Sequence, residues 1–355
     1  MKGRLEAARR AFARKGCEAF LITKEANWRY LVGFRGDYGH LAVTPTRAVL
    51  VTVGNYIEEA AQTVTEAEVV GDSIPAYGPL RDLLAAEGIT KLAFEADGMM
   101  VADLHRLERR LEGVQLVPTE RLVEEIRAVK DTGEVEAIRR ANAIADLAMK
   151  ETLPTLAEGT SERQFALELE WRMREMGSEG VAFPTIALSG PRGSLPHGVP
   201  GERTVRRGEF FTVDWGAVWD GYHSDCTRTF AVGDVDGKAR SMYDAVGAAL
   251  RAATEAARAG VHVADVDAAA RDVLTERGLG RYFVHSVGHG VGLEIHESPA
   301  LAPRGTVTLE PGMVVTVEPG VYIPGTGGIR LEDTLLITED GAEVLTGLPK
   351  NLEIL

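Results

Sequence analysis

Cysteines are scarce in this 355-residue chain, long apolar runs are missing, and each absence excludes a class of protein. The two cysteines, Cys17 and Cys226, are far apart and match no metal-ligand spacing, so we expect free buried thiols in a reducing compartment. No stretch approaches the ~20 apolar residues that span a bilayer, so no membrane role is expected. The N-terminal residues carry apolar side chains at helical spacing without a small-residue cleavage site. This pattern predicts an amphipathic helix, no signal peptide and a cytoplasmic location.

A surplus of positive charge is also missing, since the net charge is −14. Such a chain repels nucleic acid unless its cationic residues are concentrated on one face, and the arginines here are scattered. We therefore expect no nucleic-acid partner. Part of the negative surplus is explained if carboxylates are neutralised by metal ions. The apolar fraction of 45% and the charged fraction of 26% are those of an ordinary globular protein.

The chain is long enough for two domains. Short strands and helices alternate over residues 1–120, which predicts a small α/β domain. A charged helical segment at 121–131 is interpreted as a linker, and residues 132–355 as the second domain. In the first domain we expect four strands and three further helices, with the strands at 19–23, 40–44, 48–53 and 91–94 and the helices near 55–65, 80–87 and 101–111.

The second domain is predicted to be of α+β type and internally duplicated. A pair of glycines 18 residues apart brackets a helical segment twice, at Gly159 and Gly177 and again at Gly260 and Gly278. Across the offset of 101 residues the apolar positions match at Phe165 and Val266, Leu169 and Ala270, and Met173 and Leu274. A longer helix precedes each copy and a β-hairpin follows it. Equal helix lengths also arise by chance, but the pattern favours two symmetric halves with a cleft between them.

Two aspartates lie in a predicted hairpin whose turn is the Asp-Gly pair at 220–221, which suits the positive φ of a tight turn. This turn places Asp214 opposite Thr227, and Asp225 lies on the same face at a diagonal position. Diagonal neighbours are roughly 7–8 Å apart at the backbone, so both carboxylates reach a shared cation. A buried carboxylate needs such compensation. For this pair alone, a solvent-facing strand edge or a salt bridge to Arg228 is an equally good explanation.

A second hairpin repeats the arrangement around the Pro/Gly-rich turn at 324–328. Glu318 and Glu332 stand at positions of the same parity on its two arms, so they share one face, either opposite or diagonal to each other. A single histidine is ordinarily structural, whereas three around a Gly-rich turn favour a functional site. Three of the eight histidines lie between the two hairpins, namely His285, His289 and His296.

Charge balance favours two metal ions over one. Four carboxylates carry a charge of −4, which two divalent cations neutralise, and without metal the carboxylates would repel each other and some would protonate. Oxygen-rich donors with one nitrogen and no thiolate favour manganese, cobalt or zinc in a catalytic site. Two such ions about 3.5–4 Å apart hold a hydroxide and polarise a carbonyl, which predicts a hydrolase. The remaining histidines would position the substrate and its oxyanion.

Between about residues 124 and 343 the chain resembles the pita-bread metallopeptidases, the family that contains methionine aminopeptidase, aminopeptidase P, prolidase and creatinase. The motifs that carry the resemblance are, in order, FPTIALSGPRGSLPHG, VDWGAVWDGYHSDCTRT, HSVGHGVGLEIHE, TVEPGVY and GGIRLED. The resemblance implies a creatinase-like α/β N-terminal domain, a pita-bread catalytic domain with pseudo-two-fold symmetry, and a homodimer. It also implies two divalent metal ions, with Mn²⁺ preferred and Co²⁺ or Zn²⁺ as alternatives.

The same resemblance implies a role for each candidate residue. The five metal ligands fall into three groups, with Asp214 on one ion, His289 and Glu318 on the other, and Asp225 and Glu332 bridging both. Glu318 would also relay a proton from the attacking water. Four further residues would act on the substrate or its surroundings: His197 lining the site, His285 and His296 holding the substrate carbonyl and the tetrahedral intermediate, and Arg330 orienting Glu332 unless it is a plain surface arginine.

An Xaa-Pro peptidase is the branch of the family that fits best. Methionine aminopeptidases resemble only the C-terminal domain and lack a histidine at the position of His285, and creatinase has lost metal ligands that are present here. Many prolidases bind the proline carboxylate with an arginine where this chain has Ala300. Arg35 and Arg47 are candidate replacements if the first domain leans over the cleft, although simple solvation explains both equally well.

We therefore expect a dipeptidase (prolidase) acting on small proline-containing peptides. Three alternatives remain: an aminopeptidase P acting on longer peptides, a creatinase-type C–N hydrolase, and a non-catalytic pita-bread scaffold.

Overall fold

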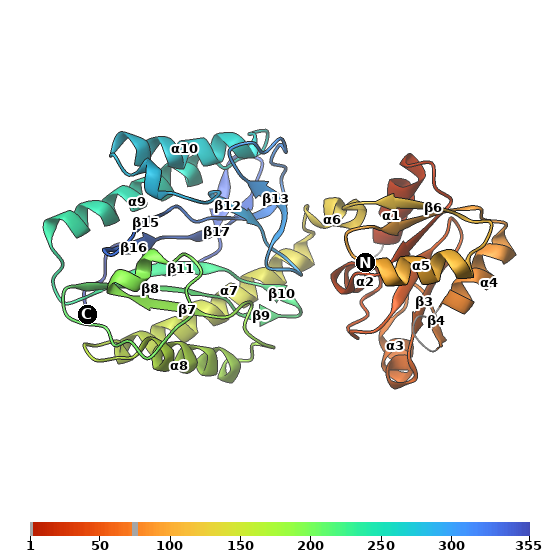
Figure 1. Cartoon of the computed structure of the whole chain (residues 1–355), viewed down its shortest axis with the longest axis horizontal. Coiled ribbons are helices and arrows are strands. Elements are labelled where there is room, and N and C mark those ends of the chain that lie inside the picture. Colours follow the sequence, from red (N-terminus) through yellow and green to blue (C-terminus); the bar gives the residue numbers. More distant parts are fainter. Residues whose placement is uncertain (1–2, 73–76) are drawn as a thin grey trace. The chain divides into compact units, whose positions relative to one another are not determined.

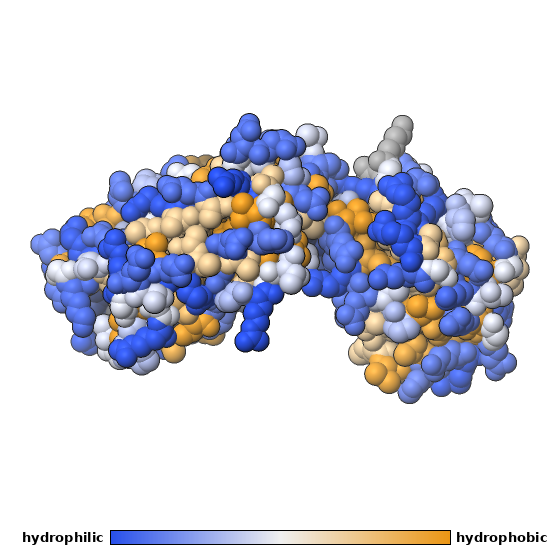
Figure 2. Space-filling view, turned by 90° about the horizontal axis from the view of Figure 1, so that it is seen from above, coloured by the Kyte–Doolittle hydropathy of each residue, from blue (hydrophilic) through white to orange (hydrophobic). Residues whose placement is uncertain are grey.

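The computed structural model describes residues 3–72 and 77–355, and the chain divides into two compact units, Met1–Arg127 and Ala128–Leu355 (Figure 1). Over the described residues, no helix is long and apolar enough to cross a membrane. Hydrophilic residues predominate on the face shown in Figure 2, because most apolar side chains are gathered in separate cores.

The N-terminal unit is built on a six-stranded mixed sheet with the strand order β4-β3-β2-β1-β5-β6. β1 pairs antiparallel with β2 and parallel with β5, and apolar side chains from the strands pack with those of α4 and α5 into one core. The strands are β1 (Ala19–Ile22), β2 (His40–Val43), β3 (Ala48–Thr52), β4 (Glu68–Gly71), β5 (Lys91–Glu95) and β6 (Gln115–Thr119). The helices are α1 (Arg4–Arg14), α2 (Glu25–Val32), η1 (Gly54–Tyr56), α3 (Ile57–Thr63), α4 (Tyr77–Glu87), α5 (Val101–Arg110) and α6 (Leu122–Arg127).

The strands and helices expected in this unit are confirmed, with ends that differ by at most three residues. The sequence patterns missed α2, β4 and β6. Five of the eight residues of α2 are buried, so only a narrow polar face at Glu25 and Arg29 marks this short helix. β4 and β6 are the two edge strands of the sheet, and their half-exposed residues form no apolar run.

The C-terminal unit consists of two halves with the same order of elements. α7 (Thr132–Thr152) and α8 (Glu162–Glu175) pack against one antiparallel sheet, and α9 (Gly237–Ala256) and α10 (Val263–Glu276) pack against another. Figure 1 shows the two helix pairs on opposite sides with the strands between them. This is the pita-bread arrangement expected from the sequence.

The predicted duplication is also confirmed in detail. α8 and α10 each have 14 residues, and the four bracketing glycines all have the positive φ values, between 73° and 96°, that suit glycine. The matched apolar positions are all buried on the inner faces of the two helices. The two copies therefore bury equivalent faces against their sheets.

The two sheets have the strand orders β11-β8-β7 and β13-β12-β14-β17-β18, and β9 with β10 and β15 with β16 form separate hairpin ladders. The strands of the first half are β7 (Ile186–Ser189), β8 (Glu209–Trp215), β9 (Val218–Trp219), β10 (Tyr222–His223) and β11 (Cys226–Val232). Those of the second half are β12 (Gly288–Gly290), β13 (Glu297–Leu301), β14 (Val314–Val317), β15 (Gly320–Ile323), β16 (Gly327–Arg330), β17 (Asp333–Ile337) and β18 (Ala342–Val344). Three 3₁₀ turns complete the unit: η2 (Leu153–Thr155), η3 (Gly190–Ser194) and η4 (Gly280–Tyr282).

Candidate active site

The first predicted hairpin forms with the expected turn and register. Residues 220–221 both have positive φ, and Asp214 lies opposite Thr227 in the ladder between β8 and β11. Asp225 comes directly before β11. Both aspartates are buried, with exposed fractions of 8% and 5%, so neither is a solvent-facing edge residue. Arg228 forms its buried ion pair with Asp333, so a salt bridge to Arg228 does not explain the two aspartates.

The second hairpin is interrupted at the two glutamates. β14 pairs with β17 up to Val317 opposite Asp333, and β15 pairs with β16 from Gly320 opposite Arg330. Glu318 and Glu332 lie opposite each other in the gap between these ladders. There the backbone N–H of Glu318 donates to the carbonyl of Val287 at 2.7 Å, and that of Glu332 donates to the carbonyl of Thr227 at 3.1 Å. These two bonds join the second hairpin to the segment of Val287 and to strand β11 of the first hairpin.

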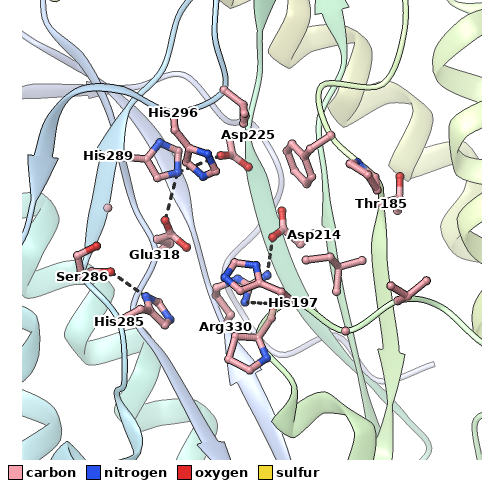
Figure 3. A pocket seen from close by; sticks show the side chains of 18 of the residues that line it. Thr185, His197, Asp214, Asp225, His285, Ser286, His289, His296, Glu318 and Arg330 are labelled. Atoms are coloured by element: carbon pink, nitrogen blue, oxygen red, sulfur yellow. Dashed lines mark hydrogen bonds and ion pairs between the residues drawn. The ribbon is translucent and has the colours of Figure 1, made fainter. Parts of the chain in front are cut away.

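Four carboxylates and one imidazole converge in a single cluster, of which Figure 3 shows Asp214, Asp225, Glu318 and His289. Ligand atoms of Asp214, Asp225 and Glu332 all lie within 4.8 Å of one another. His289 Nε2 lies 3.5 Å from Asp225 Oδ2 and 3.4 Å from Glu318 Oε1. The structure therefore brings together all five residues that the sequence predicted as metal ligands.

Two buried oxygens in this cluster, Asp214 Oδ1 and Glu332 Oε1, have no hydrogen-bond partner among the residues that the structure describes. A buried carboxylate oxygen without a partner costs free energy, so a cation is the group that would satisfy it. Four carboxylates and one neutral imidazole are hard and borderline donors suited to divalent metal ions. The residues present therefore fit the metal ions expected from the sequence.

The pKa values of the cluster support the same conclusion. Burial raises the pKa of Glu318 to about 8, and burial together with the neighbouring carboxylates raises the pKa of Asp225 and of Glu332 well above their usual range. Protons would thus occupy this cluster unless cations replace them. Burial lowers the pKa of His289 to about 4, which keeps the imidazole neutral and free to act as a ligand.

Arg330 is a buried residue of the cluster, not a surface arginine. Its guanidinium pairs with Asp214, and Nε donates to Thr227 Oγ1 at 3.0 Å, while Thr227 in turn donates to Glu332 Oε2 at 2.7 Å. The contact of Arg330 with Glu332 therefore runs through Thr227, and its direct carboxylate partner is Asp214. Arg330 Nη1 also donates to Tyr322 Oη at 2.8 Å and to the carbonyl of Pro196 at 3.2 Å.

His285 is held by hydrogen bonds to both ring nitrogens. Nδ1 lies 2.7 Å from the carbonyl of Ser286, and because a carbonyl only accepts, Nδ1 carries the proton. Nε2 then accepts from Tyr322 Oη at 2.9 Å. Burial lowers the pKa of His285 to about 4, which is consistent with this neutral tautomer. His285 therefore connects to Arg330 and Asp214 through Tyr322.

A cavity of about 490 Å³ opens beside the cluster. His197, His285 and His296 line it together with Asp214, Asp225, His289, Glu318 and Arg330, and Figure 3 shows these side chains around one space. The ring of His296 packs edge-on against that of His289, with centroids 4.4 Å apart. The rest of the wall is largely apolar and includes Phe183, Ile186, Ile295 and Ala300.

Arg35 and Arg47 belong to the N-terminal unit, where both side chains are exposed. Arg47 Nη2 forms an ion pair with Glu68 Oε2 at 2.6 Å, so its guanidinium already binds a carboxylate of its own unit.

Sequence reasoning missed Tyr322 and Thr227 as members of the site. Tyr322 is the last residue of the motif TVEPGVY, four positions after Glu318, so its place in the motif was a usable signal. Thr227 was recognised only as the partner of Asp214 in the ladder. Its hydrogen bonds to Arg330 and Glu332 depend on how two hairpins pack, which the sequence pattern does not reveal.

A cluster of buried carboxylates and a neutral imidazole beside an open cavity is typical of divalent-metal enzymes, hydrolases among them. Residues 136–339 match metallopeptidase family M24, and residues 4–129 match the Creatinase/Prolidase N-terminal domain. The chain belongs to metallopeptidase family M24, whose members use divalent metal ions.

Similar proteins cover the whole chain. The uncharacterized peptidase YqhT of Bacillus subtilis is 38% identical over 352 residues, which are 99% of this chain and 100% of the relative. The structure of an Xaa-Pro dipeptidase from Bacillus anthracis has a TM-score of 0.97 and 39% identity over 99% of both chains. That of an X-Pro aminopeptidase from Thermotoga maritima has a TM-score of 0.91 and 33% identity, again over 99% of both.

Proposed function

We propose that this chain is an Xaa-Pro dipeptidase that uses two divalent metal ions, with Mn²⁺ as the first candidate and Co²⁺ or Zn²⁺ as alternatives. The observation that carries the proposal is the interrupted hairpin, which sets Glu318 and Glu332 beside Asp214, Asp225 and His289. The names of similar proteins, Xaa-Pro dipeptidase and X-Pro aminopeptidase, support the substrate class.

The metal ions would be held as the sequence motifs imply. Asp214 would hold one ion, His289 and Glu318 would hold the other, and Asp225 and Glu332 would contribute to both. When bound, such ions supply a hydroxide at neutral pH and polarise the scissile carbonyl.

The protein's own residues complete the reaction. Glu318 would accept the proton of the attacking water and deliver it to the proline nitrogen as the peptide bond breaks. His197 and His296, which line the cavity, would donate hydrogen bonds to the substrate carbonyl and the developing oxyanion. His285 would act through Tyr322, which its Nε2 contacts. The apolar wall suits the ring of proline, which has no N–H to satisfy once it is bonded within a peptide.

Cleavage of longer peptides is the second candidate function. Ala300 lines the cavity and supplies no cation for a free proline carboxylate, and Arg330 is bound to Asp214. For the dipeptidase, we propose Arg35 and Arg47 as the candidate residues that bind the proline carboxylate of the dipeptide, since a guanidinium binds a carboxylate in a bidentate manner. Arg35→Ala or Arg47→Ala should then raise the KM for a dipeptide more than the KM for a tripeptide.

The first experiment compares hydrolysis of Leu-Pro and Leu-Pro-Gly by metal-stripped protein before and after manganese is added. Cleavage of Leu-Pro restored by metal supports the dipeptidase. Preference for Leu-Pro-Gly selects the aminopeptidase, and cleavage of neither peptide by metal-loaded protein rejects both. Asp214→Asn removes a charged proposed ligand and should abolish the metal-dependent activity.

We further propose that the protein acts as a cytoplasmic homodimer. Both cysteines are buried and free, which suits a reducing compartment. Light scattering would test the dimer, which requires twice the chain mass of 38.3 kDa.

A further inference from the structure

A buried glutamate at the start of α8 is bonded to both ends of the loop that carries His197. Glu162 has an exposed fraction of 0%. Its Oε1 accepts from the N–H and the hydroxyl of Ser189 at 2.9 and 2.8 Å, and its Oε2 accepts from the N–H of Gly201 at 3.1 Å. Because Ser189 precedes the loop and Gly201 follows it, one carboxylate fixes the two ends relative to each other.

An arginine extends this contact towards the histidine. Arg192 Nε donates to Glu162 Oε2 at 2.9 Å, and Arg192 Nη2 donates to the carbonyl of Val199 at 2.6 Å. Val199 stands two residues after His197 and lines the cavity with it. The buried carboxylate and the guanidinium thus form a clamp across the loop.

The second half of the unit contains an equivalent clamp on α10. Asp267 is also 0% exposed and forms two bonds with the guanidinium of Arg271, at 2.8 and 2.9 Å. Asp267 Oδ1 accepts from the N–H of Val287 at 2.9 Å, and Arg271 donates to the carbonyl of His285 at 2.8 Å. The guanidinium also donates to the carbonyl of Phe283 and lies over its ring, 4.3 Å from the centroid.

The two clamps share their position and their chemistry, although Glu162 and Asp267 do not match at the 101-residue offset. Each acid lies on the second helix of its half, and each arginine binds a backbone carbonyl at or near a cavity histidine. Neither pair belongs to the metal cluster. General stabilisation of the fold does not require this repeated placement beside a histidine.

We propose that Glu162 with Arg192 and Asp267 with Arg271 are positioning residues, of which the first pair aims His197 at the substrate and the second holds His285 against Tyr322. The proposal rests on the proposed function, since it assumes that His197 acts on a peptide directly and that His285 does so through Tyr322. A displacement of about 1 Å at a catalytic group lowers the rate on the order of 100-fold, so a loosened clamp should lower kcat/KM by at least about tenfold.

The test is a pair of double-mutant cycles, Glu162→Gln with His197→Ala and Asp267→Asn with His285→Ala, using metal-loaded full-length protein and Leu-Pro. The amides keep the side-chain shape but place N–H groups against donors, so each clamp loses acceptors. We expect Glu162→Gln to lower kcat/KM by about tenfold or more in the wild-type background and by less than about twofold when His197 is already alanine. Asp267→Asn should behave in the same way relative to His285.

Amide hydrogen exchange provides a readout that is independent of activity. Exchange over residues 189–201 should become faster in Glu162→Gln and exchange over 283–287 in Asp267→Asn, with the number of bound metal ions unchanged. Glu343→Gln is the matched control, because it removes an arginine pair with Arg139 that contacts neither loop. If Glu162→Gln fails to fold, Arg192→Met removes the contact with Val199 and leaves the carboxylate in place.

Equal losses of kcat/KM in the presence and absence of the histidine would overturn the clamp, because the acids would then act on the fold as a whole. Unchanged exchange in both loops would overturn it as well. Failure of the wild-type protein to cleave Leu-Pro is a different result, since it rejects the proposed function while the exchange measurement still decides whether each pair holds its loop.

Discussion

Thr227 is a small residue at the centre of the site, and its hydroxyl joins two charged groups. Oγ1 accepts from Arg330 Nε and donates to Glu332 Oε2. Valine has nearly the same shape but no hydroxyl, so Thr227→Val would leave a carboxylate oxygen and a guanidinium N–H without this partner. Loss of such an orienting contact ordinarily weakens metal binding by about 10- to 100-fold. We expect a loss of this size in calorimetric titration of Mn²⁺.

Thr152→Val is the control for this prediction. Thr152 is also fully buried, but its hydroxyl bonds to the carbonyl of Ala148 within α7. This variant should bind Mn²⁺ as tightly as the wild-type protein. An unchanged affinity in Thr227→Val would show that Glu332 does not depend on this hydroxyl for its orientation.

The titratable residues of the site predict how the stability of the metal-free protein changes with pH. The raised pKa of Glu318, about 8, means that the folded state keeps a proton that the unfolded state has lost, so stability falls as pH rises from about 4.5 to 8. The lowered pKa values of His285 and His289, about 4, act in the opposite direction, because the unfolded state binds those protons below about pH 6.5. The two effects oppose each other below pH 6.5.

Between pH 6.5 and about 8 the carboxyl effect remains, so the free energy of unfolding of the metal-free protein should fall over this interval. Bound cations replace the protons of the site and should remove its contribution to the slope. Urea unfolding at a series of pH values, with and without Mn²⁺, measures both curves. A metal-free protein that becomes more stable from pH 6.5 to 8 would contradict the raised pKa of the glutamate.

At the scale of elements, the tip of the interrupted hairpin packs against η3, which leads into the loop of His197. Gly328 and Gly193 touch through their backbones, and a Cβ atom added at Gly328 would overlap the carbonyl oxygen of Gly193. Gly328→Ala must therefore shift one backbone segment, at a cost of about 1–3 kcal/mol, and it should also lower kcat/KM because the loop moves. Thermal unfolding and steady-state kinetics measure the two effects.

Gly237→Ala provides the comparison for Gly328→Ala. A Cβ atom at Gly237, the first residue of α9, meets nothing within 4 Å, and alanine favours the helix. This variant should be at least as stable as the wild-type protein and equally active. If Gly328→Ala matched Gly237→Ala in both measurements, the close contact between β16 and η3 would be shown to matter neither for stability nor for activity.

The sequence predicted each hairpin better than it predicted how the two hairpins pack against each other. An Asp-Gly turn needs positive φ, which fixed the register of Asp214 against Thr227, and equal parity placed Glu318 and Glu332 on one face. The break between the ladders was not predictable, because it arises where each glutamate N–H leaves its own hairpin to bond with another segment. The ion pair between Arg330 and Asp214 was also missed, because the two residues lie 116 positions apart in sequence and meet only when the hairpins pack together.

At the scale of the whole molecule, each unit has its own apolar core, and all five proposed metal ligands belong to Ala128–Leu355. A ligand stabilises the part of a protein that binds it, by about 2.7 kcal/mol when its concentration is 100 times Kd. For a unit of this size that corresponds to a rise of about 5–10 °C in Tm. We therefore expect two transitions in calorimetry, of which Mn²⁺ raises one and chelation lowers it again.

Hydrogen exchange during heating would assign the two transitions. Peptides from the core of α9 and α10 should gain protection with Mn²⁺, whereas peptides from β1 and β5 should exchange at an unchanged rate. Asp214→Asn supplies the control, since loss of a proposed ligand should reduce the shift of the metal-sensitive transition and leave the other in place. A single transition that Mn²⁺ raises as a whole would show that the two units unfold as one cooperative body, and the metal site would then stabilise the entire chain.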